Sequence, residues 1–106
     1  MKVEVEFTTV ARAELLALLR LRSRSVEDAV RFAIVYAEAA ERQFVASEGF
    51  PVGVERVVRP TGDSWWWQYV NGVWFGYVIA DRGTWPSKRI RRVRVAHCRE
   101  TRPTVT

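Results

Sequence analysis

The residues best suited to chemistry lie near the carboxyl end of this 106-residue chain, where arginine alternates with valine and a single histidine follows. Imidazole titrates closer to neutral pH than any other side chain, so His97 is the natural general acid or base. A guanidinium group can donate two hydrogen bonds to phosphate oxygens, which makes Arg92 and Arg94 candidate phosphate ligands. These residue types favour an anionic substrate or partner.

A second group of residues is aromatic. The run Trp65–Tyr77 predicts a hairpin of two strands closed by Asn71-Gly72, because both central positions of a type I′ turn need a positive φ. Tyr69 and Trp74 offer rings that can stack on nucleobases. Rings and arginines on one sheet are typical of a nucleic-acid surface, although the same residues also fit a core with a solvated face.

Strand alternation leaves the role of the histidine open. Strict alternation places Arg92 and Arg94 on one face and Val93, Val95 and His97 on the other. On that face His97 would be a partly buried structural residue, whereas an irregularity at the strand's end would leave it available for catalysis. Arg92 and Arg94 fit either a phosphate site or the solvated side of an antiparallel sheet.

The aromatic hairpin contains two further signals. Tyr77 lies between Phe75 and Ile79, a pattern that fits core packing as well as a functional phenol. Gly76, among bulky neighbours, indicates a bulge or a close approach by another group. The run Trp65–Trp67 sends indoles to both faces of its strand, so at least one should be exposed or covered by a partner.

The charge balance is basic and uneven. The chain has 17 basic and 12 acidic residues, a formal charge of +5, and only Lys2 and Lys88 are not arginine among the basic ones. Codon bias explains an excess of arginine, and so does a polyanionic partner, which could be RNA or an acidic protein. The chain has a single cysteine, so no disulfide can form within it. One cysteine and one histidine are too few ligands for a structural zinc site, and we expect neither a metal nor a cofactor. With no apolar run long enough to span a bilayer, we expect a cytoplasmic protein.

Hydrophobic periodicity predicts an α+β fold. A strand over Lys2–Phe7 precedes a helix capped by Thr8 or Thr9, a break at Arg20–Arg24, and a longer helix over Val26–Ala46 with Ser25 as its cap. The later strands are expected at Val54–Arg59, Trp65–Val70, Val73–Ala80 and Arg89–Cys98. In outline the order is β-α-α-β-β-β, with an N-terminal helical hairpin packed on one face of a mainly antiparallel sheet. Residues 1–100 would form one domain, and 101–106 a polar tail.

This order of elements, with certain residues, resembles a known family. The matching segments are Ala11–Leu15 after the first strand, Phe50–Gly53 after the long helix, the strand Val73–Ile79, and above all the closing run Ile90–Pro103 with its histidine followed by arginines. In these segments the chain resembles the RelE/ParE superfamily of toxins from bacterial type II toxin–antitoxin pairs.

The resemblance implies two activities. RelE-like toxins cut mRNA on the ribosome without a metal, through attack of a ribose 2′-hydroxyl on the adjacent phosphate, whereas ParE-like toxins inhibit DNA gyrase. Both are neutralised by an antitoxin. A ribosome-dependent endoribonuclease is our first interpretation; the alternatives are a gyrase inhibitor and a non-enzymatic basic module that binds RNA or protein. The expected catalytic residues are His97, Arg59, Arg94 and Tyr77, and the expected phosphate- and substrate-binding residues are Arg56, Arg92, Arg99, Trp74 and Tyr69.

One position departs from the family pattern. RelE-like toxins usually carry an arginine just after the hairpin turn, where this chain has Trp74. An indole can stack on a base but cannot neutralise a phosphate. Either another arginine takes this role, or the chain does not cleave RNA.

Overall fold

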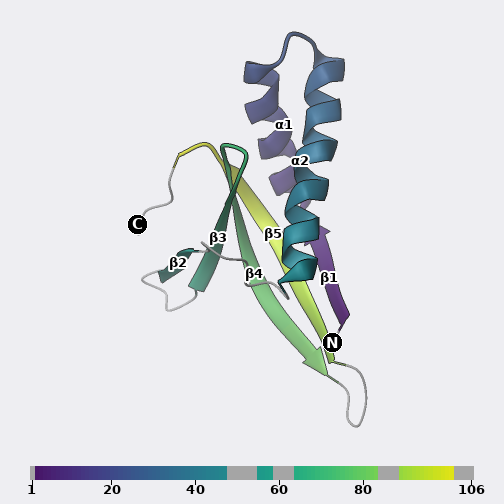
Figure 1. Ribbon diagram of the computed structural model, residues 1–106. Coiled ribbons are helices and arrows are strands. Elements are labelled where there is room, and N and C mark those ends of the chain that lie inside the picture. The colour runs from purple at the N-terminus through teal and green to yellow at the C-terminus, as the bar shows by residue number, and fades with distance from the viewer. Residues whose placement is uncertain (1, 48–54, 59–63, 84–88, 102–106) are drawn as a thin grey trace.

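The computed structural model describes residues 2–47, 55–58, 64–83 and 89–101. They form an α+β fold of two helices and one five-stranded mixed sheet, shown in Figure 1. The elements are β1 (Lys2–Phe7), α1 (Thr9–Arg22), α2 (Val26–Ala46), β2 (Glu55–Val58), β3 (Ser64–Val70), β4 (Val73–Gly83) and β5 (Arg89–Arg99). Four strands therefore follow the helices, each where a strand was expected, so the summary order β-α-α-β-β-β is one strand short.

The sheet is mixed because its first strand runs parallel to its last. The strand order is β1-β5-β4-β3-β2, in which all neighbours are antiparallel except β1 and β5. A parallel pair needs a long crossover connection, and here that connection comprises both helices and three strands. The expectation of a mainly antiparallel sheet is thus confirmed, and the pairing of β1 with β5 is its one parallel exception.

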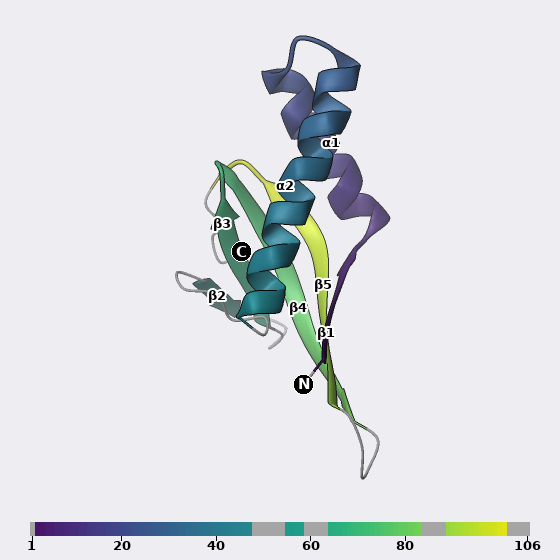
Figure 2. The same cartoon turned by 45° about the vertical axis from the view of Figure 1, so that its right-hand side comes forward.

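Both helices begin at the predicted caps. The side chain of Thr8 accepts a hydrogen bond from the Ala11 amide, and that of Ser25 accepts one from Asp28. Helix α1 continues to Arg22, so the predicted break at Arg20–Arg24 is too long. Figures 1 and 2 show an antiparallel helical hairpin whose tip projects beyond the sheet. Within the described residues, no helix combines the length and apolarity needed to cross a membrane.

The β3–β4 hairpin has the predicted turn. Asn71 and Gly72 have φ values of 52° and 85°, as a type I′ turn requires. Further along β4 the pairing with β5 shifts, since Gly76 is opposite His97 while Tyr77 is opposite Val95. Ala96 is therefore an extra residue on β5, and the predicted irregularity at Gly76 is confirmed as a β-bulge.

The helices and the sheet enclose one apolar core. Phe75, Tyr77, Val93 and Val95 of the sheet are fully buried, and Phe44 of α2 packs on Tyr77 with ring centroids 4.6 Å apart. The alternate residues of the same strands project to the opposite side. We call that side the helix-free face, because α1 and α2 pack on the other side; α1 comes close to it only at the edge of β5 beyond the end of β1.

Candidate nucleic-acid interface

The helix-free face collects aromatic and basic side chains in adjacent rows. The register places Trp67, Gly76 and His97 side by side across β3, β4 and β5. The next row consists of Tyr69, Trp74 and Arg99. Residues from two hairpins thus meet on one surface, and the predicted combination of rings and arginines is present there.

Two aromatic contacts organise the second row. The rings of Tyr69 and Trp74 pack with centroids 5.0 Å apart, and Tyr69 is 51% exposed. The guanidinium carbon of Arg99 lies 5.3 Å from the centroid of the Trp67 ring. Within the described residues Arg99 has no carboxylate partner, so its charge is available to an anion. This corner of the face offers an exposed ring beside an exposed cation, the combination used to bind single-stranded nucleic acid.

His97 lies on the helix-free face because of the bulge. The extra residue Ala96 breaks the alternation after Val95, so Cys98 rather than His97 continues the buried row. The imidazole packs against the Trp65 ring, with centroids 5.3 Å apart and the planes at 50°. Strict alternation, which assigns His97 to the valine face, is therefore wrong at this position.

The imidazole has a carboxylate partner that the sequence did not indicate. His97 Nδ1 lies 3.0 Å from Oε1 of Glu14 on α1, and the two side chains are 35% and 34% exposed. Helix α1 reaches this position because β1 ends at Phe7 and the Thr8 amide donates to the Val95 carbonyl, at 2.9 Å. Because the two residues are 83 positions apart in the sequence, no spacing rule links Glu14 to His97.

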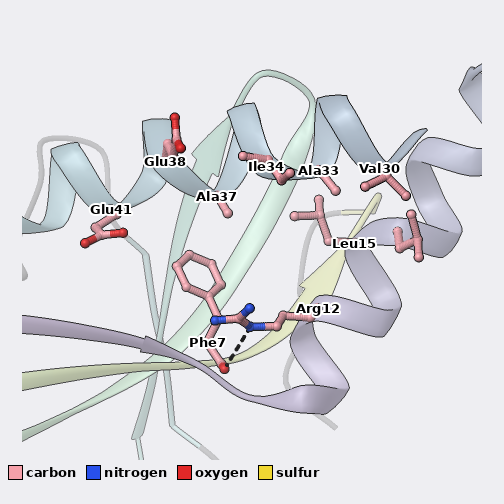
Figure 3. Close-up of a pocket in the computed structure, with 10 residues that line it drawn as sticks. Phe7, Arg12, Leu15, Val30, Ala33, Ile34, Ala37, Glu38 and Glu41 are labelled. Atoms are coloured by element: carbon pink, nitrogen blue, oxygen red, sulfur yellow. Dashed lines mark hydrogen bonds between the residues drawn. The ribbon is translucent and has the colours of Figure 1, made fainter. Parts of the chain in front are cut away.

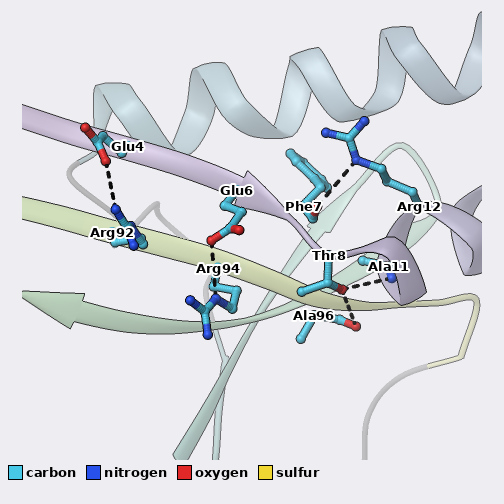
Figure 4. A network of polar contacts seen from close by, with 9 residues as sticks. All are labelled: Glu4, Glu6, Phe7, Thr8, Ala11, Arg12, Arg92, Arg94 and Ala96. Carbon is cyan, nitrogen blue, oxygen red and sulfur yellow. Dashed lines mark hydrogen bonds and ion pairs between the residues drawn. The ribbon is translucent and has the colours of Figure 1, made fainter.

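Arg92 and Arg94 share the helix-free face, as predicted, but each is already paired. Arg92 Nη2 lies 3.4 Å from Glu4 Oε2, and Arg94 Nε lies 3.3 Å from Glu6 Oε2 (Figure 4). The parallel register of β1 and β5 places each glutamate directly beside its arginine. A phosphate would have to compete with these carboxylates, so the two arginines are weaker phosphate ligands than strand alternation suggests.

Two other predicted residues do not join this face. Tyr77 is fully buried on the helix side, where burial raises the pKa of its phenol well above the ordinary value. It has no access to a substrate, so the catalytic assignment of Tyr77 is wrong. Arg56 pairs in register with Trp66 on the helix side, and its guanidinium carbon lies 5.6 Å from that ring. Arg59 lies outside the described residues.

A groove of about 320 Å³ opens between the two helices and the end of β1 (Figure 3). Arg12 lies in the groove and donates through Nε to the Phe7 carbonyl, at 3.4 Å. The lining of the groove is apolar apart from Arg12, Glu38 and Glu41. Its apolar residues are Phe7, Leu15, Leu16, Val30, Ala33, Ile34 and Ala37. This composition suits a binding surface for another protein better than a site for acid–base chemistry.

Comparison with family models, with curated proteins and with solved structures gives no match for this chain. The described residues contain no group of three or more histidine, cysteine or carboxylate side chains placed to hold a metal ion. The feature of this chain that indicates a function is therefore the helix-free face itself.

Proposed function

We propose that this chain is the toxin of a type II toxin–antitoxin pair with a RelE/ParE-like fold, and that it is a metal-independent endoribonuclease acting on mRNA at the ribosome. The observation that carries the proposal is the position of His97, half-buried on the same sheet face as Arg99 and the stacking rings of Tyr69 and Trp74. A proton-transfer group, a cation and base-stacking rings are what cleavage of single-stranded RNA requires.

The chemistry needs few groups. The ribose 2′-oxygen attacks the adjacent phosphorus and the bond to the 5′-oxygen breaks, leaving a 2′,3′-cyclic phosphate and a 5′-hydroxyl. His97 takes the proton of the 2′-hydroxyl, and the departing 5′-oxygen receives a proton from solvent. Arg99 stabilises the negative charge that grows on the non-bridging oxygens. Arg94 lies on the other side of His97, and it contributes only if it separates from Glu6. Tyr69 and Trp74 hold the flanking bases by stacking.

A gyrase inhibitor is the second candidate, and specific observations favour it. Trp74 stands where RelE-like toxins usually have an arginine, Tyr77 is buried, and Glu4 and Glu6 occupy Arg92 and Arg94. Each of these features weakens phosphate binding or proton transfer. A face with few side chains able to bind phosphate or transfer a proton would still bind another protein.

Support for an antitoxin partner comes from the helices. Leu16 of α1 and Val30 and Ile34 of α2 are exposed along the apolar groove, and Glu38 and Glu41 lie beside them. An antitoxin segment with apolar residues flanked by lysine or arginine would match this surface. We propose that the cognate antitoxin covers the groove.

Induced expression in bacteria distinguishes the candidates. The chain and its His97→Ala variant are expressed separately, and the 5′ ends of cellular mRNA are mapped. Arg31→Ala, on the exposed surface of α2, is the control. Cuts within codons of translated messages, with 5′-hydroxyl ends that His97→Ala abolishes and Arg31→Ala retains, would support the endoribonuclease. Growth arrest with intact messages and an SOS response would refute it in favour of gyrase inhibition.

A further inference from the structure

The pair formed by Glu14 and His97 carries an inference that deepens the proposed function. We infer that Glu14 is a positioning residue: its carboxylate fixes the imidazole of His97 in the Nδ1–H tautomer and leaves the Nε2 lone pair for the substrate. The catalytic consequence of this assignment rests on the proposed function, whereas the tautomer itself does not.

The hydrogen bond determines which nitrogen carries the proton. A carboxylate is an acceptor only, so at a separation of 3.0 Å the Nδ1 of His97 must be the donor. In the neutral imidazole the other nitrogen is then an acceptor. Within the described residues Nε2 has no hydrogen-bond partner, so its lone pair is available to take a proton.

Two contacts from different elements fix the ring. Glu14 holds Nδ1 from α1, and the Trp65 indole packs against the imidazole from β3. Together they restrict both rotation and tilt of the ring, and a general base must be held in this way to reach one proton. One partner belongs to a helix and the other to the sheet, so the imidazole is constrained from more than one direction.

The position of Glu14 is itself set by buried contacts. Leu15, the next residue, is buried in the core, and Ala11, one turn earlier, is fully buried against the sheet. Thr8 ties the start of the helix to β5 through its amide and through its hydroxyl, which donates to the Ala96 carbonyl at 3.4 Å. The helix therefore presents Glu14 to His97 from a rigid support, and the carboxylate needs little rearrangement to bind Nδ1.

The test exploits the fact that the chain has one histidine. Long-range ¹H–¹⁵N correlation spectra of the ¹⁵N-labelled full chain, recorded about two pH units above the ordinary pKa of imidazole, report the tautomer of His97 directly. We expect Nδ1–H in the wild type and loss of that single tautomer in Glu14→Ala. Glu14→Gln, which keeps an acceptor oxygen, should retain more of it. Glu27→Ala, an exposed glutamate of α2, is the control and should leave the spectrum unchanged.

Activity provides the second measurement. In a ribosome-dependent cleavage assay, Glu14→Ala should lower kcat by about 10- to 100-fold with little change in KM, as for other carboxylates that orient a functional imidazole. A wild-type spectrum with Nε2–H, or a Glu14→Ala spectrum that keeps Nδ1–H, would overturn the inference. If the tautomer behaves as expected but the wild type cuts no RNA, the positioning assignment stands and the proposed function fails.

Discussion

The indole of Trp67 lies directly over Gly76: a Cβ atom on residue 76 would lie 2.6 Å from Cη2 and Cζ3 of that ring. Trp67 is only 5% exposed, so it has little room to move away. Residue 76 must therefore be glycine because a side chain approaches it closely, and not because of its backbone conformation. Among the described glycines, Gly72 has a positive φ and Gly76 does not. This contact lies in the row that contains His97, and it shapes the floor of the helix-free face.

The contact predicts a steric cost for a methyl group at this position. Gly76→Ala should lower the free energy of unfolding by about 1–3 kcal/mol, the usual range for overpacking. Urea denaturation of the variant measures the effect. In a Trp67→Ala background the same change should cost much less, because the clash is gone. Equal costs in both backgrounds would mean that the indole is not the obstacle.

The ion pairs of β1 with β5 predict that two glutamates restrain RNA binding. Glu4→Gln combined with Glu6→Gln should free Arg92 and Arg94, raise affinity for single-stranded RNA, and steepen the salt dependence by up to about 0.7 per added phosphate contact. Fluorescence anisotropy at several salt concentrations measures both quantities. Stability should change little, because half-exposed pairs contribute about 0–1 kcal/mol each.

The control for this experiment makes the same change in net charge elsewhere. Glu27→Gln combined with Glu41→Gln alters two exposed carboxylates of α2, away from the helix-free face. An equal gain in affinity from both double variants would show that net charge alone, and not the release of the two arginines, is responsible.

Because Arg99 and Arg56 lie on opposite faces of the sheet, we expect the loss of either positive charge to affect RNA affinity differently. Arg99→Gln removes a cation from the helix-free face, and we expect RNA affinity to fall on the order of tenfold, or about 1.4 kcal/mol. Arg56→Gln removes one from the helix side and should change affinity by much less. Anisotropy titrations of the two variants under identical conditions compare them. The assignment of the binding face would be wrong if Arg56→Gln had the larger effect.

Two buried acids predict a loss of stability at alkaline pH. Burial, followed by the charge of Glu14, raises the pKa of the Cys98 thiol from 9.0 to about 12. Between these values the unfolded chain releases a proton that the native chain keeps, so stability is complete below pH 9 and falls as the pH rises toward 12. The limiting slope is about 1.4 kcal/mol per pH unit for one group. Tyr77 acts in the same direction from its ordinary value of 10.0.

Denaturation below pH 9 and at about pH 11 measures this effect. Cys98→Ala should be less stable than the wild type at the lower pH because of the cavity it creates. It should then lose less stability on going to the higher pH, because the thiol's share of the proton release is gone. A pH dependence identical to that of the wild type would contradict the assignment.

Much of the local structure could be predicted because its causes are local. Thr8 and Ser25 cap the helices through amides three residues ahead, and Asn71-Gly72 determines its turn through the φ values it tolerates. Alternation of apolar residues located all five strands to within a few residues. The bounds were least accurate at Arg20–Arg24 and at the end of β4, where tertiary contacts extend an element beyond its local signal.

The candidate site was harder to predict because it depends on pairing between distant strands. The sequence by itself determined that arginines, aromatic rings and a histidine would share a sheet, since residue type and alternation settle that much. Only the tertiary structure decided the rest: a bulge at Ala96 moved His97 to the helix-free face, and the parallel pairing of β1 placed Glu4 and Glu6 on the arginines. Packing of α1 against β5 supplied Glu14. Register and helix docking are set by burial over the whole core, and no short segment of the chain encodes them.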